Sequence, residues 1–266
     1  MIGFVIPCSF NNRINILKLC KFFSNKEHLK ICLVLDKKLI SFLSNEKVKF
    51  KNILLKNTES NNVSYKRNIG IKSLLKEKNI EYISFLDSDC FINERNLKLI
   101  QNYLLNYPNK DIYFINIITK SKKRIGNKLK NYYFNLNFLN IYRAGTPSII
   151  IKSNFINNLF DTNFGIGTDN FSAEDTKFLI DNFSYNVRVI DDAKIFHPND
   201  KMNYDKIKNY SYGQKILIKT IKFPHNFIFF TMIIYRPFLG LIYSIFKFDT
   251  NLIKIYLVRL KQLIYV

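Results

Sequence analysis

Tryptophan is absent from this chain of 266 residues, and acidic residues are scarce. Against 41 lysines and arginines stand only 20 aspartates and glutamates, so the formal net charge is +21. The lack of Trp, together with abundant Lys, Asn, Ile, Phe and Tyr, is typical of an AT-rich coding sequence, which explains part of this charge. The remaining excess still predicts attraction to a polyanion, whether nucleic acid, an anionic membrane or a phosphate-bearing substrate.

Cysteine is also rare, and its placement excludes a disulfide framework. The four cysteines are widely spaced, form no C-x-x-C pair and lie in apolar stretches, so we expect reduced core residues of a cytosolic chain: Cys8, Cys20, Cys32 and Cys90. Residues 1–7 lack a basic region and a cleavage site and are expected to form a strand, not a secretion signal. With 47% hydrophobic residues, the chain can bury a core, which excludes disorder of the whole.

Apolar runs alternate with helical patterns through the first 200 residues. Strands are predicted at 2–6, 31–35, 82–86, 111–118, 148–151 and 187–190. Helices are predicted around 16–23, 63–78 and 174–183. Because several of these strands are apolar throughout, we expect them to be buried on both faces, which is typical of an α/β sheet.

Polar motifs follow two of the predicted strands. Asp36 ends one of them and Asp87-Ser88-Asp89 ends another, at the sheet edge that faces the ligand crevice in open α/β folds. Carboxylates suit Mg²⁺ or Mn²⁺, which complete their coordination shells with substrate phosphates. An acidic turn after a strand would show the same tripeptide without any ligand. A helix start that carries Lys66, Arg67 and Asn68 adds a phosphate-binding neighbourhood.

These motifs, in this order, resemble the family 2 glycosyltransferases of the GT-A fold. The first half of the resemblance rests on Ile6-Pro7, Asn11-Asn12-Arg13, Asp36, Lys66-Arg67-Asn68-Ile69-Gly70 and Phe85-Leu86-Asp87-Ser88-Asp89. The second half rests on Gly165-Ile166-Gly167-Thr168-Asp169 and Ser172-Ala173-Glu174-Asp175-Thr176, similar to the glycine-rich acceptor loop and acidic helix start of the family. Two departures are Lys66, where a small residue is usual, and Asp36-Lys37-Lys38, where a second acid and a glycine are frequent.

The resemblance implies a Rossmann-like mixed sheet flanked by helices, forming a catalytic domain over residues 1–205. It implies an inverting, metal-dependent transferase that moves a sugar from a nucleotide-diphosphate sugar, with a UDP-sugar expected, to a glycan in surface polysaccharide synthesis. Donor binding is expected at Pro7, Asn11, Arg13, Asp36, Arg67, Asn68, Asp87 and Ser88. Asp89 and His197 are expected to hold Mn²⁺ or Mg²⁺, and Gly167 and Glu174 to bind the acceptor.

Asp175 is expected to be the catalytic base of this reaction. Glycosyl transfer needs a group that takes the proton of the acceptor hydroxyl, and a carboxylate at a helix N-terminus that faces the crevice fits this role. An acidic pair at that position, Glu174 with Asp175, is also favoured by the helix dipole alone. His197 likewise has two interpretations, because a lone histidine is often structural, although imidazole is an acceptable ligand for Mn²⁺.

Residues 206–266 are predicted to form a separate basic, apolar helical extension. The runs Phe227–Ile234 and Phe238–Phe246 are each too short to span a bilayer, and Arg236-Pro237 is expected to interrupt their sum. The pattern predicts a re-entrant hairpin or interfacial helices, followed by a basic amphipathic helix over Leu252–Tyr265. We expect a peripheral protein at the cytoplasmic face of an anionic membrane, with a lipid-linked oligosaccharide as acceptor. Padding of the catalytic domain or an oligomer interface is the alternative.

Two other functions were weighed against this interpretation. Nucleotidyltransferases of the same fold usually carry a glycine-rich loop after the first strand, and residues 7–13 contain no glycine. A basic polyanion-binding protein on a degenerate GT-A fold is the main alternative. Because the positive residues are scattered and the acidic motifs would then have no role, no nucleic-acid partner is expected. Residues 120–145, which are expected to shape the sugar pocket, contain no pattern that identifies the sugar, acceptor or linkage.

Overall fold

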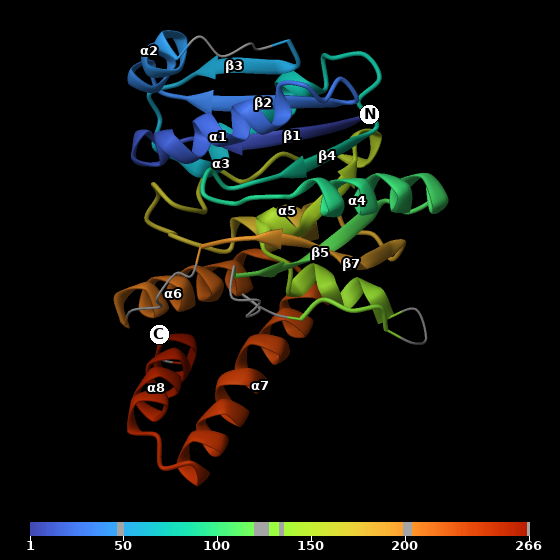
Figure 1. Cartoon of the computed structure of the whole chain (residues 1–266). Helices are drawn as coiled ribbons and strands as arrows, with labels where there is room; N and C mark the ends of the chain where they lie inside the picture. Colours follow the sequence, from blue (N-terminus) through green and yellow to red (C-terminus); the bar gives the residue numbers. More distant parts are fainter. Residues whose placement is uncertain (47–50, 120–127, 133–135, 199–203, 265–266) are drawn as a thin grey trace.

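The computed structural model describes residues 1–46, 51–119, 128–132, 136–198 and 204–264. Within them, seven strands form one mixed sheet in the order β3-β2-β1-β4-β6-β5-β7 (Figure 1). The strands are β1 (Ile2–Pro7), β2 (Leu29–Leu35), β3 (Ile53–Asn57), β4 (Tyr82–Phe85), β5 (Ile112–Ile118), β6 (Ile149–Lys152) and β7 (Val187–Phe196). Only β6 runs antiparallel to its neighbours. All six predicted strands are confirmed, and β3 is an addition.

Helices cover both faces of the sheet. They are α1 (Arg13–Phe23), α2 (Lys37–Asn45), α3 (Val63–Leu74), α4 (Glu94–Asn106) and α5 (Glu174–Asp181). One apolar cluster joins the sheet to α1, α2 and α4, and a second cluster joins it to α3 and α5. Within β1, Phe4 and Ile6 belong to the first cluster and Val5 to the second, which confirms strands buried on both faces. The four cysteines are buried free thiols, as predicted.

Side-chain caps fix where three of these helices begin. Asp36 accepts a hydrogen bond from the backbone N–H of Leu39 at 2.8 Å at the start of α2. Asn62 at α3 and Asn93 at α4 accept equivalent bonds from backbone N–H groups three residues on, at 3.0 and 2.8 Å. Each cap satisfies a backbone donor that the first helical turn cannot pair. The start of α3 is therefore fixed locally by its own sequence.

The chain ends in three helices, α6 (Tyr204–Thr220), α7 (His225–Phe246) and α8 (Thr250–Ile264). Leu217 and Ile221, together with Phe229 of α7, belong to the same apolar cluster as α3 and α5. Beyond this contact, α7 runs away from the sheet and α8 returns beside it as an antiparallel hairpin (Figure 1). The predicted amphipathic helix is thus confirmed as α8.

The predicted interruption at Arg236-Pro237 is wrong, because α7 continues through Pro237 for 22 residues. A proline inside a helix removes one backbone donor, and packing against a neighbouring helix can offset this loss. Here the ring of Tyr256 on α8 lies so close to Gly240 that an added Cβ would approach it to 2.4 Å. At 1.5 Å per residue, α7 is about 33 Å long. Among the described residues it is the one helix whose length and composition would allow it to cross a membrane.

We expect Gly70→Ala to destabilise the fold, because α3 contacts β1 at this glycine. An added Cβ would lie 2.3 Å from Cγ1 of Val5, a buried strand residue. Overpacking of this kind costs about 1–3 kcal/mol, although alanine is otherwise the better helix former by about 1 kcal/mol. Denaturant unfolding should show the loss for Gly70→Ala and none for the control Lys72→Ala on the exposed face of the same helix. Equal stability of the two variants would contradict this packing.

Candidate active site

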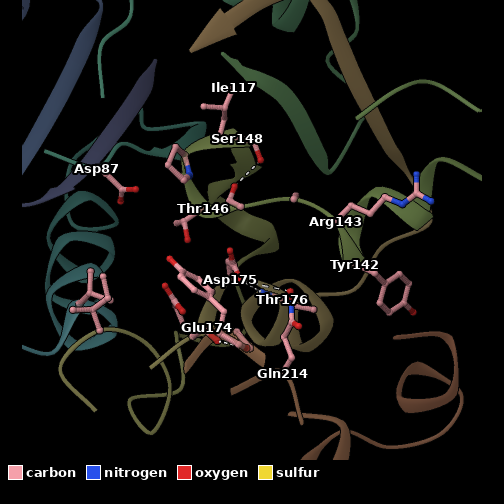
Figure 2. Close-up of a pocket in the computed structure, with 18 of the residues that line it drawn as sticks. Asp87, Ile117, Tyr142, Arg143, Thr146, Ser148, Glu174, Asp175, Thr176 and Gln214 are labelled. Atoms are coloured by element: carbon pink, nitrogen blue, oxygen red, sulfur yellow. Dashed lines mark hydrogen bonds between the residues drawn. The ribbon is translucent and has the colours of Figure 1, made fainter. Parts of the chain in front are cut away.

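Two adjoining cavities lie at the carboxyl ends of β4, β5 and β7. The larger, about 400 Å³, is lined by residues including Arg67, Glu174 and Asp175. The smaller, about 300 Å³, is lined by residues including Pro7, Asn12, Ser88 and Asp89. Their shared lining includes Asp87, His197 and Tyr210. In Figure 2, Asp87 lies at one side of the larger cavity and Arg143 at the other, with Asp175 between them. This edge of the sheet is where the sequence predicted the ligand crevice.

Arg67 connects the two halves of this site. Its guanidinium is buried, with 3% of the residue exposed. Nη2 donates to Asp87 Oδ1 at 3.0 Å, and Nη1 donates to Glu174 Oε1 at 3.1 Å. Burial alone would lower the pKa of Arg67, but the two carboxylates outweigh it and raise that pKa. Arg67 therefore holds the carboxylate that follows β4 beside the one that opens α5.

The neighbours of Arg67 on α3 are also bonded within the protein. Lys66 is buried, and its Nζ donates to the backbone carbonyl of Cys8 in the loop after β1, at 2.8 Å. Asn68 was predicted to bind the donor, but it makes two hydrogen bonds to the backbone of Phe160. Its Nδ2 donates to the carbonyl and its Oδ1 accepts from the N–H, both at 2.8 Å. Three successive side chains of α3 thus connect three separate segments of the site.

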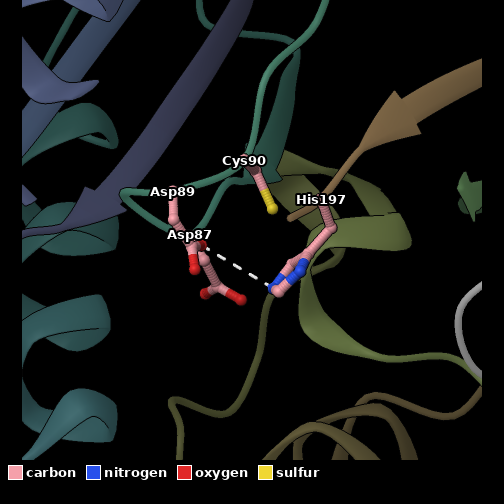
Figure 3. A group of neighbouring side chains, drawn as sticks. All are labelled: Asp87, Asp89, Cys90 and His197. Carbon is pink, nitrogen blue, oxygen red and sulfur yellow. Dashed lines mark ion pairs between the residues drawn. The ribbon is translucent and has the colours of Figure 1, made fainter. Parts of the chain in front are cut away.

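Asp87, Asp89, Cys90 and His197 form a cluster in which one possible ligand atom of each lies within 4.8 Å of the others (Figure 3). His197 reaches it because backbone hydrogen bonds pair Phe91 with Phe196, immediately before the histidine. Its Nδ1 donates to the carbonyl of Pro198 at 2.7 Å, which leaves Nε2 facing Asp89 Oδ1 at 3.7 Å.

The chemistry of this cluster fits a hard divalent cation. Two carboxylates and an imidazole nitrogen are acceptable ligands for Mn²⁺ or Mg²⁺. Burial raises the pKa of the Cys90 thiol well above its ordinary value, so Cys90 remains protonated and is not a competing thiolate. Asp87, Asp89 and His197 are therefore the residues that could hold the ion.

Asp175 lies in the first turn of α5, two residues after the N-cap residue Ala173. Ala173 has a φ of +75°, an uncommon conformation for a non-glycine residue that directs the start of α5 into the cavity. Burial, and secondly the neighbouring charge of Glu174, raise the pKa of Asp175 to about 7, from an ordinary 3.8. Its Oδ1 accepts a hydrogen bond from the backbone N–H of Thr176 at 2.7 Å. The carboxyl group is therefore able to exchange a proton near neutral pH.

The glycine-rich loop before α5 docks on the start of α3. Gly165 and Gly167 have φ values of +102° and +91°, which L side chains rarely adopt. A Cβ at Gly167 would lie 2.6 Å from the backbone oxygen of Asn61, and the N–H of Val63 donates to the carbonyl of Ile166 at 3.0 Å. Gly167 is thus required by the close backbone approach at this position, beside the cavity edge that Ile166 lines.

The predicted site residues fall into two groups. The structure gathers eight of them around the two cavities: Pro7, Arg67, Asp87, Ser88, Asp89, Glu174, Asp175 and His197. The remaining five do not line these two cavities: Asn11 is exposed, Arg13 stacks on Phe10, Asp36 caps α2, Asn68 bonds to Phe160, and Gly167 lies against the backbone of Asn61. The predicted roles of both groups stay predictions.

Sequence reasoning missed several residues that line the cavities. Asn12, next to the predicted Asn11, donates from Nδ2 to Ser88 Oγ at 2.7 Å and so connects the loop after β1 to the Asp-Ser-Asp loop. The motif Asn11-Asn12-Arg13 was identified from the sequence but donor binding was assigned to Asn11, and the sequence does not distinguish between the two neighbouring asparagines. Tyr210 and Gln214 of α6, Arg143, and Arg259 of α8 belong to no motif, so no local signal could have identified them.

No protein-family model matches this chain, and a search of curated proteins found no match. Among solved structures, it is similar to crystal structures of residues 1–349 of S. aureus TarS, alone and in complex with UDP, with a TM-score of 0.61 and 16% identity. The match covers 85% of this chain and 68% of that one. The structure of TarS 1–349 in complex with UDP-GlcNAc has the same TM-score of 0.61. The predicted GT-A fold, a mixed sheet flanked by helices, is thereby confirmed.

We expect Asp175→Asn to stabilise the protein increasingly as the pH rises. Because the pKa of Asp175 is higher in the folded state, about 7 against an ordinary 3.8, the folded state binds more protons between these values and stability falls as the pH rises. The isosteric amide removes this penalty. Thermal unfolding should show the midpoint of Asp175→Asn rising above wild type by more at pH 8 than at pH 5. The control Asp192→Asn, at an exposed carboxylate, should show a constant difference; a constant difference for Asp175→Asn as well would refute the raised pKa.

Proposed function

We propose that this chain is an inverting, metal-dependent glycosyltransferase that uses a nucleotide-diphosphate sugar, with a UDP-sugar as the expected donor. The observation that carries the proposal is one cavity that brings Asp175, a carboxyl group with a pKa of about 7, together with Asp87 and His197 of the hard-cation cluster. The similarity in fold to TarS, crystallised with UDP and UDP-GlcNAc, supports the donor class. A glycan or lipid-linked oligosaccharide is the proposed acceptor.

In this proposal Asp175 is the general base. Its carboxylate takes the proton of an acceptor hydroxyl while the hydroxyl oxygen forms a bond to the anomeric carbon of the donor. The bond from that carbon to the phosphate oxygen breaks, and its electron pair leaves with the nucleoside diphosphate. Attack on the side opposite the leaving group inverts the anomeric centre. A pKa of about 7 suits this role, because a large fraction of the base is then deprotonated at neutral pH.

Asp89 and His197, with Asp87, are the residues that would hold Mn²⁺ or Mg²⁺. The bound ion would supply positive charge to the departing diphosphate. Arg67 contributes differently, because its two carboxylate partners already use its charge. It positions Asp87 for the donor side of the site and Glu174 for the acceptor side. Glu174, next to the base, also helps to keep the pKa of Asp175 raised.

We expect the chain to bind a nucleotide sugar in a metal-dependent manner. Calorimetric titration with a panel of nucleotide sugars, with and without Mn²⁺, should identify one that binds only with the ion. Asp89→Ala should weaken this binding by about tenfold or more, equivalent to at least about 1.4 kcal/mol. Asp192→Ala, which removes an exposed carboxylate from β7, should bind like wild type. If no nucleotide sugar binds under either condition, the proposed donor class is wrong, and polyanion binding on this fold becomes the better interpretation.

We further propose that α7 attaches the enzyme to the cytoplasmic face of a membrane. Its surface and flanking turns expose many large apolar side chains, namely Phe223, Phe227, Phe230, Tyr235, Phe238, Leu239, Ile242, Tyr243, Ile245, Phe246 and Phe248. Residues 206–266 contain a single acidic residue, Asp249, so anionic lipid head groups would meet little repulsion. A contiguous apolar surface of this kind marks an interaction site, and a lipid bilayer matches both its length and its charge.

Replacing Phe227, Phe238 and Phe246 by Gln should release the protein from membranes. These side chains are 62%, 52% and 78% exposed, so the fold does not depend on them. Burying each phenyl group in lipid contributes about 2 kcal/mol, so co-sedimentation with vesicles containing an anionic phospholipid should fall about 100-fold or more. The matched control replaces three exposed apolar residues of the sheet domain, Ile14, Leu105 and Tyr185, by Gln. Equal loss in both triple variants would show that α7 has no special role.

A further inference from the structure

A third cavity, of about 200 Å³, lies between the catalytic domain and the α7–α8 hairpin. It is lined by Tyr142, Arg143, Gln214, Met232, Ile233, Tyr235, Pro237 and Arg259. Four of these residues also line the larger cavity that contains Asp175: Tyr142, Arg143, Gln214 and Arg259. A ligand in the third cavity would therefore adjoin the space in front of the proposed base.

The polar side of this cavity is cationic. Arg143 follows the short 3-10 segment Leu136–Tyr142, whereas Arg259 comes from the middle of α8, so only the tertiary fold brings the two guanidinium groups to one cavity. Among the described residues, no Asp or Glu lines this cavity. The single acid of residues 206–266, Asp249, caps the start of α8 by accepting a bond from the N–H of Leu252 at 3.0 Å. It is ten residues before Arg259, about 15 Å along the helix axis.

Arg259 is not neutralised by any described residue. It has no hydrogen bond or ion pair with another residue of the described part of the chain, and burial lowers the pKa of its guanidinium. Arg143 already contacts Tyr132, to whose hydroxyl its Nη1 donates, and this contact orients it. A desolvated guanidinium favours an anion with several acceptor oxygens, because its planar donors match carboxylate and phosphate groups.

The other side of the cavity is apolar. Met232, Ile233 and Pro237 come from α7, the helix whose outer surface exposes the large apolar residues described above. A ligand that fits both sides has an anionic head with several oxygens and an apolar chain. Free phosphate would satisfy only the arginines, and a neutral lipid would satisfy only α7.

We propose that Arg143 and Arg259 form a subsite for the phosphate or diphosphate of a lipid-linked acceptor, whose apolar chain leaves along α7. This inference rests on the proposed transferase function and assigns a binding position to the phosphate of the acceptor beside the same site. The glycan attached to the phosphate would extend from this subsite through the shared lining towards Asp175. The amphipathic helix α8 thus packs beside α7 and also contributes to this subsite, because Arg259, one of its basic residues, lines the cavity.

The experiment measures binding of three probes to the full chain in a neutral detergent, after subtraction of partitioning into micelles alone. The probes are farnesyl diphosphate, inorganic pyrophosphate and farnesol. The variants are Arg259→Gln, Arg143→Gln and, as matched control, Arg95→Gln, which removes an exposed arginine from α4. Thermal unfolding accompanies each titration, and Arg143→Gln tests the subsite independently if Arg259→Gln does not fold. UDP-sugar binding is measured on the same samples.

We expect farnesyl diphosphate to bind wild type and Arg95→Gln equally, and each of the other two variants about tenfold or more weakly. Pyrophosphate should bind more weakly than farnesyl diphosphate, and farnesol should show no dependence on the arginines. If Arg95→Gln weakens the binding of farnesyl diphosphate as much as the other two variants do, the effect comes from general positive charge and the subsite is overturned. Pyrophosphate binding as tightly as farnesyl diphosphate would overturn the lipid part. If farnesyl diphosphate binds the two arginine variants as tightly as wild type while a UDP-sugar still binds, this inference alone is rejected. If wild type binds no UDP-sugar, the proposed function is rejected.

Discussion

The site depends on one ion triad, in which the buried Arg67 connects two partly exposed carboxylates, Asp87 and Glu174. These carboxylates are 87 residues apart in the chain, and the guanidinium between them would be costly to bury without both partners. The triad therefore fixes the distance between the loop after β4 and the start of α5. The hard-cation cluster lies on one side of it and Asp175 on the other, so the relative placement of the two chemical centres follows from this interaction.

The same helical turn organises the surroundings of the triad. Successive side chains of an α-helix point in different directions, and Lys66, Arg67 and Asn68 accordingly bond to the loop after β1, to the triad and to Phe160. Residues that sequence reasoning assigned to phosphate binding are thus used to hold the cavity walls together. In the proposed reaction, positive charge for the departing diphosphate would then come mainly from a cation that Asp89 and His197 would hold.

The three cavities form a sequence across the molecule, from Asp89 through Asp175 to Arg259, with shared lining residues at each junction. The first end lies among loops at the edge of the sheet, where the proposed water-soluble donor would bind. The other end lies against the apolar hairpin of α7 and α8. This arrangement would let the proposed transferase take its two substrates from different phases, because polar residues join the cavity of Asp175 to the one beside α7, whereas α7 itself exposes apolar side chains.

The sequence by itself determined six of the seven described strands, the buried cysteines, the Asp-Ser-Asp loop at a strand end and the acidic start of α5, because hydrophobic periodicity and strand-end chemistry are local properties. Only the tertiary structure decided which neighbours these residues have. It used Asn68 to hold a loop, let α7 continue through Pro237 and brought Arg143 to Arg259. The pairings of Asn68 with Phe160 and of Arg143 with Arg259 join residues 92 and 116 positions apart in the chain, so no local pattern encodes them; their energy comes from contacts that form only in the folded chain.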